Sequence, residues 1–218
     1  WPDLEVRGIH LDLKYMMHRK DYLRRWIESL AAWKINVLLL EYEDKFPYRQ
    51  SVLRRPAAFT ERELRDFLDH ARARGLRVIP LIQTLGHVEY ILKHDQFARL
   101  RKNGFHTEYD TLHPETWPFI RAMLDEVLEF HGSDEWFHVG GDECWHLKQE
   151  KPAVKARLYG DHIAKVLNYV VQRGKRPLLW DDMIRSLPNR ELAIVLRRLP
   201  KKTILCCWNY DSTPCAPR

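Results

Sequence analysis

The chain has 218 residues, of which 45% are hydrophobic and 30% are charged. This balance is typical of a folded globular protein and argues against an intrinsically disordered chain. No apolar run approaches the roughly 20 residues that span a bilayer as a helix, so we expect no membrane partner.

The formal net charge is +6 at pH 7, and an excess of basic residues raises the question of nucleic-acid binding. The basic residues are spread along expected helices and alternate with acids, as in Glu61-Arg62-Glu63. We therefore interpret them as a solvated helix surface and expect no nucleic-acid partner.

The four cysteines, Cys144, Cys206, Cys207 and Cys215, fit neither a disulfide framework nor a CxxC metal knuckle. We expect free thiols, which favour a cytoplasmic location. The chain starts at Trp1 without a signal-like segment. We therefore expect a cut N-terminus, which leaves the compartment open.

Apolar runs in the first part of the chain alternate with amphipathic segments. A strand over residues 6–11 precedes a helix over 21–33, and the continuous apolar run over 37–40 is typical of a strand covered on both faces. Helical spacing places five side chains of this helix near one face: Tyr22, Trp26, Ile27, Leu30 and Trp33.

The next helix carries start and stop signals. Thr60 and Glu63 have the spacing of a capping box, and Gly75 stands where a C-terminal glycine belongs. A third strand follows over 78–82. The expected buried stripe of the helix consists of Leu64, Phe67, Leu68 and Ala71.

The rest of the chain continues the alternation after a long connection. We expect helices over 117–130, 159–172 and 191–199, and strands over 136–139, 178–180 and 204–208. Six strands alternating with helices predict an α/β fold with a parallel sheet, either doubly wound or closed as a barrel. Ile163, Val166, Leu167 and Val170 form one helix stripe, and Gly174 ends that helix.

The segments that follow the strands carry the first functional signal. GxGxxG and GxxxxGK[ST] motifs are both absent, which argues against the common nucleotide-binding folds. In a (β/α)8 barrel the carboxyl ends of all strands face one mouth, where active sites lie. Polar and aromatic residues recur at these positions: Asp12, Glu41, Glu43, Asp44, Gln83, His87, Asp142, Glu143, Trp180, Asp181, Asp182, Trp208 and Tyr210.

The stretch EWFHVGGDECWH, residues 135–146, places adjacent acids at the tip of an expected buried strand. Asp142 and Glu143 would be costly to bury without partners, and mutual repulsion separates their pKa values. Because Gly140 and Gly141 permit unusual backbone angles, both acids can reach one pocket. A catalytic acid pair is the favoured interpretation, and loop acids paired with arginine or a helix N-terminus are the alternative.

Metal and serine chemistry have weaker support. The set His138, Asp142, Glu143 and His146 matches no metal motif, HExxH is absent, and there is no GxSxG nucleophile motif. We therefore expect no metal and no cofactor.

Several of these motifs together resemble the family 20 glycoside hydrolases, which are β-N-acetylhexosaminidases. They are Arg7-Gly8-Ile9-His10-Leu11-Asp12, Gly86-His87, His138-Val139-Gly140-Gly141-Asp142-Glu143 and Trp180-Asp181-Asp182. The stretch EYEDKFPY, residues 41–48, is most similar to the hexosaminidase D branch of that family. The resemblance covers nearly the whole chain in the right order.

The resemblance implies a retaining exo-glycosidase acting on an amino-sugar glycoside, in which the 2-acetamido oxygen of the substrate is the nucleophile. It implies that Asp142 orients the acetamido group and that Glu143 is the general acid and then the general base. The implied substrate-binding residues are Arg7, His87, Trp180, Asp182, Trp208 and Tyr210.

The resemblance also implies a fold class, a (β/α)8 barrel catalytic domain over residues 1–218. Only about six βα units are visible, so we expect strands seven and eight to be missing. An alternative function is a truncated barrel that binds amino sugars without cleaving them. The choice between N-acetylglucosamine and N-acetylgalactosamine, and the oligomeric state, stay open.

Overall fold

The computed structural model describes residues 2–210, and its contacts divide the chain into two compact units. Unit 1 is formed by Trp1–Ile82 and Ala122–Trp136, and unit 2 by Gln83–Arg121 and Phe137–Arg218. Each unit is described by itself below.

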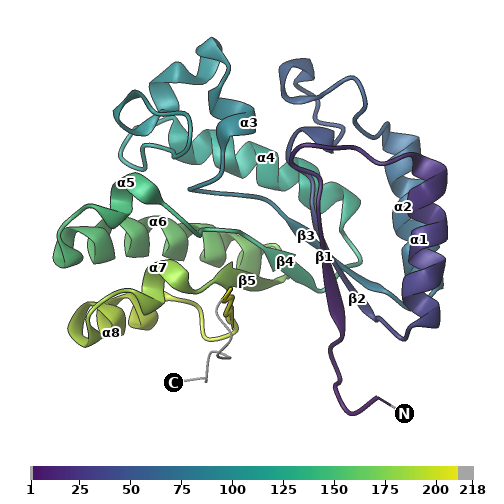
Figure 1. Ribbon diagram of the computed structural model, residues 1–218. Coiled ribbons are helices and arrows are strands. Elements are labelled where there is room, and N and C mark those ends of the chain that lie inside the picture. The colour runs from purple at the N-terminus through teal and green to yellow at the C-terminus, as the bar shows by residue number, and fades with distance from the viewer. Residues whose placement is uncertain (1, 211–218) are drawn as a thin grey trace. The chain divides into compact units, whose positions relative to one another are not determined.

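Unit 1 contains three parallel strands that pair in chain order: β1 (Gly8–Asp12), β2 (Val37–Glu41) and β3 (Arg77–Leu81). The connections between them are the helices α1 (Lys20–Ala32) and α2 (Glu61–Ala73), which lie side by side (Figure 1). This is the repeating strand–helix–strand arrangement that the alternating sequence pattern predicts. Short 3-10 turns follow β2 at Glu43–Lys45 and Ser51–Leu53.

The local signals of α2 are confirmed. The Thr60 side chain accepts a hydrogen bond from Glu63 N, and the Glu63 side chain accepts one from Thr60 N, which completes a capping box. Gly75 follows the helix with a φ of 78°, the left-handed conformation that glycine adopts without a Cβ penalty. All four residues of the predicted stripe are buried.

The five residues predicted to lie near one face of α1 are not all buried. Ile27 and Leu30 are buried together with Leu23, whereas Tyr22 is 48% and Trp33 is 70% exposed. The buried positions have i, i+4, i+7 spacing, and Tyr22, one residue before Leu23, is turned about 100° away from that line. Trp33 is the C-cap residue of the helix.

Unit 2 contains the end of β4 (Trp136–His138), together with β5 (Arg176–Trp180) and β6 (Ile204–Cys206). β5 and β6 are parallel. Val139 N donates to Leu178 O at 2.9 Å and Trp180 N donates to Gly140 O at 3.1 Å, so the chain beyond β4 runs alongside β5. The predicted sixth strand was too long, since it ends at Cys206.

The helices of unit 2 include α6 (Pro152–Gln172) and α8 (Asn189–Arg198), and α4 (Thr116–Phe130) begins in unit 2 and continues in unit 1. α6 begins seven residues before the predicted start, with Pro152 at its first turn, where a missing N–H costs nothing. The predictions omitted short elements near the strand ends: α3 (Glu89–Leu92), Asp95–Leu100, Lys102–Gly104, α5 (Trp145–Lys148) and α7 (Asp182–Arg185).

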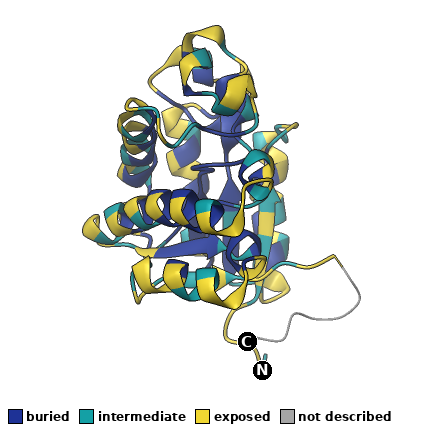
Figure 2. Ribbon diagram, turned by 90° about the vertical axis from the view of Figure 1, so that its left-hand side faces the viewer, coloured by how far each residue is buried: buried dark blue, intermediate teal, exposed yellow. Residues whose placement is uncertain are grey.

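Buried residues gather on strands β2, β3 and β5, and each long helix carries both buried and exposed residues (Figure 2). The predicted stripe of α6 is fully buried, and Gly174 follows that helix with a φ of 78°. Among residues 2–210, no helix combines the length and apolar character needed to cross a bilayer.

Candidate active site

The turn after β4 requires glycine at two positions. Gly140 and Gly141 have φ values of 67° and 86°. A Cβ on Gly140 would lie 1.9 Å from Gln83 Oε1, and one on Gly141 would lie 2.8 Å from Leu179 Cδ1. The predicted role of these glycines is confirmed, because the turn needs left-handed backbone and has no room for a side chain.

Hydrogen bonds from neighbouring elements of unit 2 hold this turn. Thr84 Oγ1 donates to Val139 O at 2.8 Å, and Gly141 N donates to Gln83 Oε1 at 3.3 Å. The buried Tyr159 of α6 donates its hydroxyl to Gly141 O at 3.0 Å. The backbone that presents the two acids is therefore fixed from both sides.

Asp142 and Glu143 converge on one imidazole. His87 Nε2 lies 3.4 Å from Asp142 Oδ2 and 3.2 Å from Glu143 Oε2. His87 and Glu143 both have left-handed backbone, with φ values of 54° and 47°, a conformation that is uncommon for non-glycine residues and clusters at functional sites. The structure thus brings together the two acids that the resemblance makes catalytic and His87, which it makes substrate-binding.

The two acids differ in environment. The Asp142 side chain is 15% exposed and that of Glu143 is 29% exposed. Burial alone would raise the pKa of Asp142, but the hydrogen bond and charge of His87, with help from Gln83, hold it below its ordinary value. Asp142 is therefore ionised at neutral pH, and the cause is the contact with His87 rather than repulsion by its neighbour.

His87, Asp142 and Glu143 each offer a potential metal-ligand atom, and these atoms lie within 4.8 Å of one another. The imidazole of His87 already lies between the two carboxylates, whereas Asp142 Oδ1 is buried without a hydrogen-bond partner among the described residues. The histidines of the set considered from sequence lie elsewhere. His138 accepts from Gly140 N through Nδ1, and His146 stacks on Phe105 with ring centroids 4.1 Å apart.

Asp182, at the start of α7, contacts the backbone of the acid pair. Its Oδ2 accepts a hydrogen bond from Glu143 N at 3.2 Å and lies 3.2 Å from Lys148 Nζ. Its Oδ1 is buried and has no hydrogen-bond partner among the residues that the structure describes. That Asp182 also contacts substrate remains a prediction.

The predicted aromatic walls lie at the ends of β5 and β6. Trp180 packs against His138 with ring centroids 4.3 Å apart, and it is half-buried. Trp208 is also half-buried, and its ring lies 5.2 Å from that of Tyr210, which is 94% exposed. Arg185 donates to Trp208 O at 3.2 Å and so holds this segment against α7.

Arg7 precedes β1 in unit 1, at the amino end of the strand. Its guanidinium donates to backbone carbonyls, Lys34 O at 2.6 Å, Glu5 O at 3.3 Å and Leu4 O. Binding of sugar hydroxyls by Arg7 stays a prediction, and it would require the guanidinium to exchange these carbonyls for substrate.

The acids at and just after the end of β2 form contacts within unit 1. Glu41 Oε2 lies 3.0 Å from His10 Nε2. Asp44 pairs with Arg55 at 2.9 Å and with the buried Lys45. These pairs stabilise the loop after β2, and each of these acids has a basic partner.

Sequence reasoning missed Glu108, in the long connection before α4. It is 2% exposed, and its Oε2 accepts a hydrogen bond from His146 N at 3.0 Å at the start of α5. Burial raises its pKa, partly offset by hydrogen bonds from His146 N and Leu147 N. No local pattern marks this acid, since its hydrogen-bond partner His146 lies 38 residues further along the chain.

The cysteines that the structure describes, Cys144, Cys206 and Cys207, form no disulfide, as predicted, and Cys215 lies outside the described residues. Cys144 is fully buried directly after Glu143, and burial raises its pKa well above the ordinary value. It therefore remains a protonated thiol.

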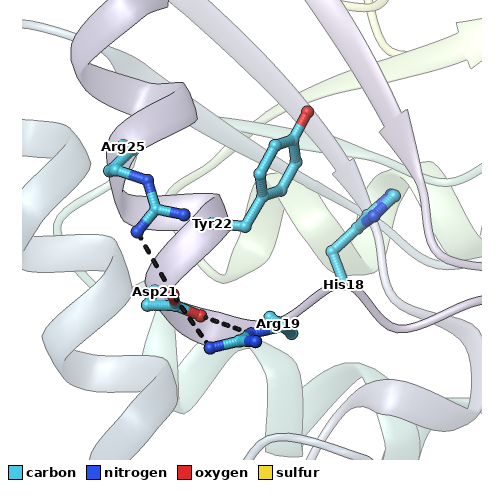
Figure 3. A pocket seen from close by; sticks show the side chains of 5 residues that line it. All are labelled: His18, Arg19, Asp21, Tyr22 and Arg25. Carbon is cyan, nitrogen blue, oxygen red and sulfur yellow. Dashed lines mark hydrogen bonds and ion pairs between the residues drawn. The ribbon is translucent and has the colours of Figure 1, made fainter.

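A separate surface hollow of about 400 Å³ lies at the start of α1 in unit 1 (Figure 3). It is lined by His18, Arg19, Asp21, Tyr22 and Arg25. The Asp21 carboxylate pairs with both arginines, each at 3.1 Å. The hollow thus carries internally paired charges rather than an unmatched basic patch.

Comparisons with known proteins show the family of the chain. The model of glycosyl hydrolase family 20, catalytic domain, matches residues 5–217. Hexosaminidase D of Bos taurus is 36% identical over 223 residues, and hexosaminidase D of Homo sapiens is 35% identical over 222 residues, each covering 95% of this chain. The chain spans 63% and 45% of the length of those two relatives.

A solved structure shares the fold. The Flavobacterium johnsoniae chitobiase matches with a TM-score of 0.75 at 21% identity, over 95% of this chain and 34% of that one. This similarity confirms the predicted class, an α/β fold corresponding to part of a (β/α)8 barrel. The chain therefore belongs to glycosyl hydrolase family 20.

Proposed function

We propose that the protein is a retaining exo-β-N-acetylhexosaminidase that removes terminal N-acetylglucosamine or N-acetylgalactosamine by substrate-assisted hydrolysis. The observation that carries the proposal is the convergence of Asp142 and Glu143 on His87 at the end of β4. Membership of family 20 and relatives named hexosaminidase D support the same substrate class.

The proposed reaction has two steps. In the first, the acetamido oxygen of the substrate attacks C1, the C1–O bond to the leaving group breaks, and the leaving oxygen takes the proton of the Glu143 carboxyl. In the second, water attacks C1 of the oxazolinium ion, Glu143 takes a proton from the water, and the bond to the acetamido oxygen breaks. The family is an exception to the two-carboxylate scheme of most glycosidases.

Asp142 would orient the acetamido group and stabilise the positive charge that develops on it. Its lowered pKa supports this role, because only the ionised carboxylate offers that stabilisation. His87, which contacts both carboxylates, is proposed to support the acid pair. Trp180, Trp208 and Tyr210 are proposed to surround the sugar, and Arg7 is proposed to bind its hydroxyls.

The substrate test uses the full-length protein and two aryl glycosides. An aryl β-N-acetylglucosaminide should be cleaved and the matching aryl β-glucoside should not, because the second lacks the nucleophile. A thiazoline mimic of the oxazolinium should bind far more tightly than the product sugar. Comparable turnover of both glycosides would refute the mechanism, and binding of amino sugar without turnover would favour the non-catalytic alternative.

The roles of the two acids are separated by the leaving group. General acid catalysis contributes about 10²–10⁴-fold, and a nitrophenolate needs that help less than a sugar alkoxide does. Glu143→Gln should therefore lose more activity on a disaccharide than on a nitrophenyl glycoside in single-turnover kinetics. Asp142→Asn should lose a similar factor on both, since every substrate shares the acetamido group. The reverse pattern would show that the roles are exchanged.

A further inference from the structure

We infer that Asp182 is a positioning residue that holds the backbone of Glu143 in its left-handed conformation and so aims the proposed general acid. The inference rests on the proposed function for its effect on the reaction, while the anchoring contact itself does not. All the residues involved belong to unit 2.

Glu143 is held in an unfavourable conformation. Its φ of 47° brings Cβ close to backbone atoms, which is why non-glycine residues seldom adopt it. Such a conformation persists only where neighbouring contacts enforce it. The neighbour on the chain, Cys144, is buried, but its thiol contacts the carbonyls of Gly141 and Asp142 rather than Glu143.

Asp182 supplies an enforcing contact. Its Oδ2 accepts the Glu143 N–H at 3.2 Å, and a carboxylate acceptor makes this bond stronger than a neutral one. The bond joins the turn after β4 to the first residue of α7, 39 positions along the chain (Figure 1). A rotation of Glu143 toward ordinary backbone angles would swing its N–H away from Asp182 and break the bond.

Lys148 stabilises the Asp182 carboxylate that accepts the Glu143 N–H. The Asp182 side chain is only 8% exposed, and a buried carboxylate is costly without a partner of opposite charge. Lys148 Nζ, at the end of α5, lies 3.2 Å from the same oxygen. The helix that follows Glu143 therefore contributes the charge that keeps the Glu143 anchor in place.

This arrangement predicts an effect on the acid step rather than on substrate affinity. Without the anchor, the Glu143 backbone can relax and the carboxyl moves away from the leaving oxygen. Substrates with poor leaving groups should then suffer more than those with good ones, as they do when the acid itself is replaced. A direct contact between Asp182 and the sugar would instead raise KM for both kinds of substrate alike.

The experiment compares Asp182→Ala and Asp182→Asn with wild type in the full-length protein, with Asp161→Ala as control. Asp161 is an exposed acid of α6 whose partner is Arg198 at 2.7 Å. Single-turnover rates are measured on a disaccharide and a nitrophenyl glycoside, and hydrogen exchange is measured at the Glu143 amide. The Asp182→Asn variant keeps an acceptor oxygen for Glu143 N, so it still tests the inference if Asp182→Ala fails to fold.

The expected result for Asp182→Ala is a loss of about tenfold or more on the disaccharide, within the range of general acid catalysis, a smaller loss on the nitrophenyl glycoside, and faster exchange at Glu143. Asp182→Asn should recover part of both, and Asp161→Ala should match wild type. Equal losses on both substrates with a raised KM, or unchanged amide exchange, would overturn the inference. A wild-type protein without turnover would refute the proposed function instead, and the Glu143 exchange rate would then decide the anchoring by itself.

Discussion

Acidification from pH 7 to pH 4 should remove about 3 kcal/mol of stability through one buried side chain, His162 of α6. His162 is 6% exposed, and its Nε2 lies 2.7 Å from Thr84 O. Burial lowers its pKa from 6.5 to about 4, because the charged imidazolium loses its hydration. At about 1.4 kcal/mol per pKa unit, this difference corresponds to about 3.5 kcal/mol in all, of which about 3 kcal/mol is lost by pH 4, where the folded imidazole is half protonated.

The sign follows from which state binds the proton. Above pH 6.5 the imidazole is neutral in the folded and the unfolded chain, so the stabilising contribution is fully present. As the pH falls from 6.5 toward 4, the unfolded chain takes up a proton that the folded chain refuses, and stability is lost. Below about pH 4 both states are protonated and the loss levels off.

The assay is urea unfolding at a series of pH values for wild type and His162→Gln. Other groups also titrate in this range, so the informative quantity is the difference in unfolding free energy between the two proteins. The disadvantage of the glutamine variant at pH 7 should shrink by about 3 kcal/mol by pH 4. Ile163→Val, a buried change without a titrating group, should show a constant difference. A constant difference for His162→Gln as well would refute the reasoning.

Two further substitutions test local geometry. Gly86→Ala would place a Cβ 2.5 Å from Asp142 O, so we expect lower stability in thermal unfolding and lower turnover because the acids are displaced. Gly132→Ala is the control, since it has open space around it and should resemble wild type. Thr60→Ala removes the confirmed capping box of α2 and should cost about 0.5–2 kcal/mol in urea unfolding; Thr60→Ser should restore most of it, and equal losses for both variants would argue against the cap.

Local order along the chain was predictable because it depends on near neighbours. The capping box at Thr60, the glycines that end α2 and α6, and the buried stripe of α6 all follow from spacings of a few residues. The same is true of the turn after β4, since a pair of glycines before two acids already signals unusual backbone. The predicted boundaries failed where short helices interrupt connections, because a four-residue helix such as α5 leaves no periodic signal.

The sequence by itself determined which residues could do chemistry, but only the tertiary structure decided which of them meet. His87 contacts both acids, and Asp182 accepts a hydrogen bond from Glu143 N, because the ends of separate elements pack together in unit 2. Glu108 carries no local mark and is found only through its contact with α5. A side chain at a strand end can point several ways, and long-range packing selects one of them, which spacing along the chain cannot encode.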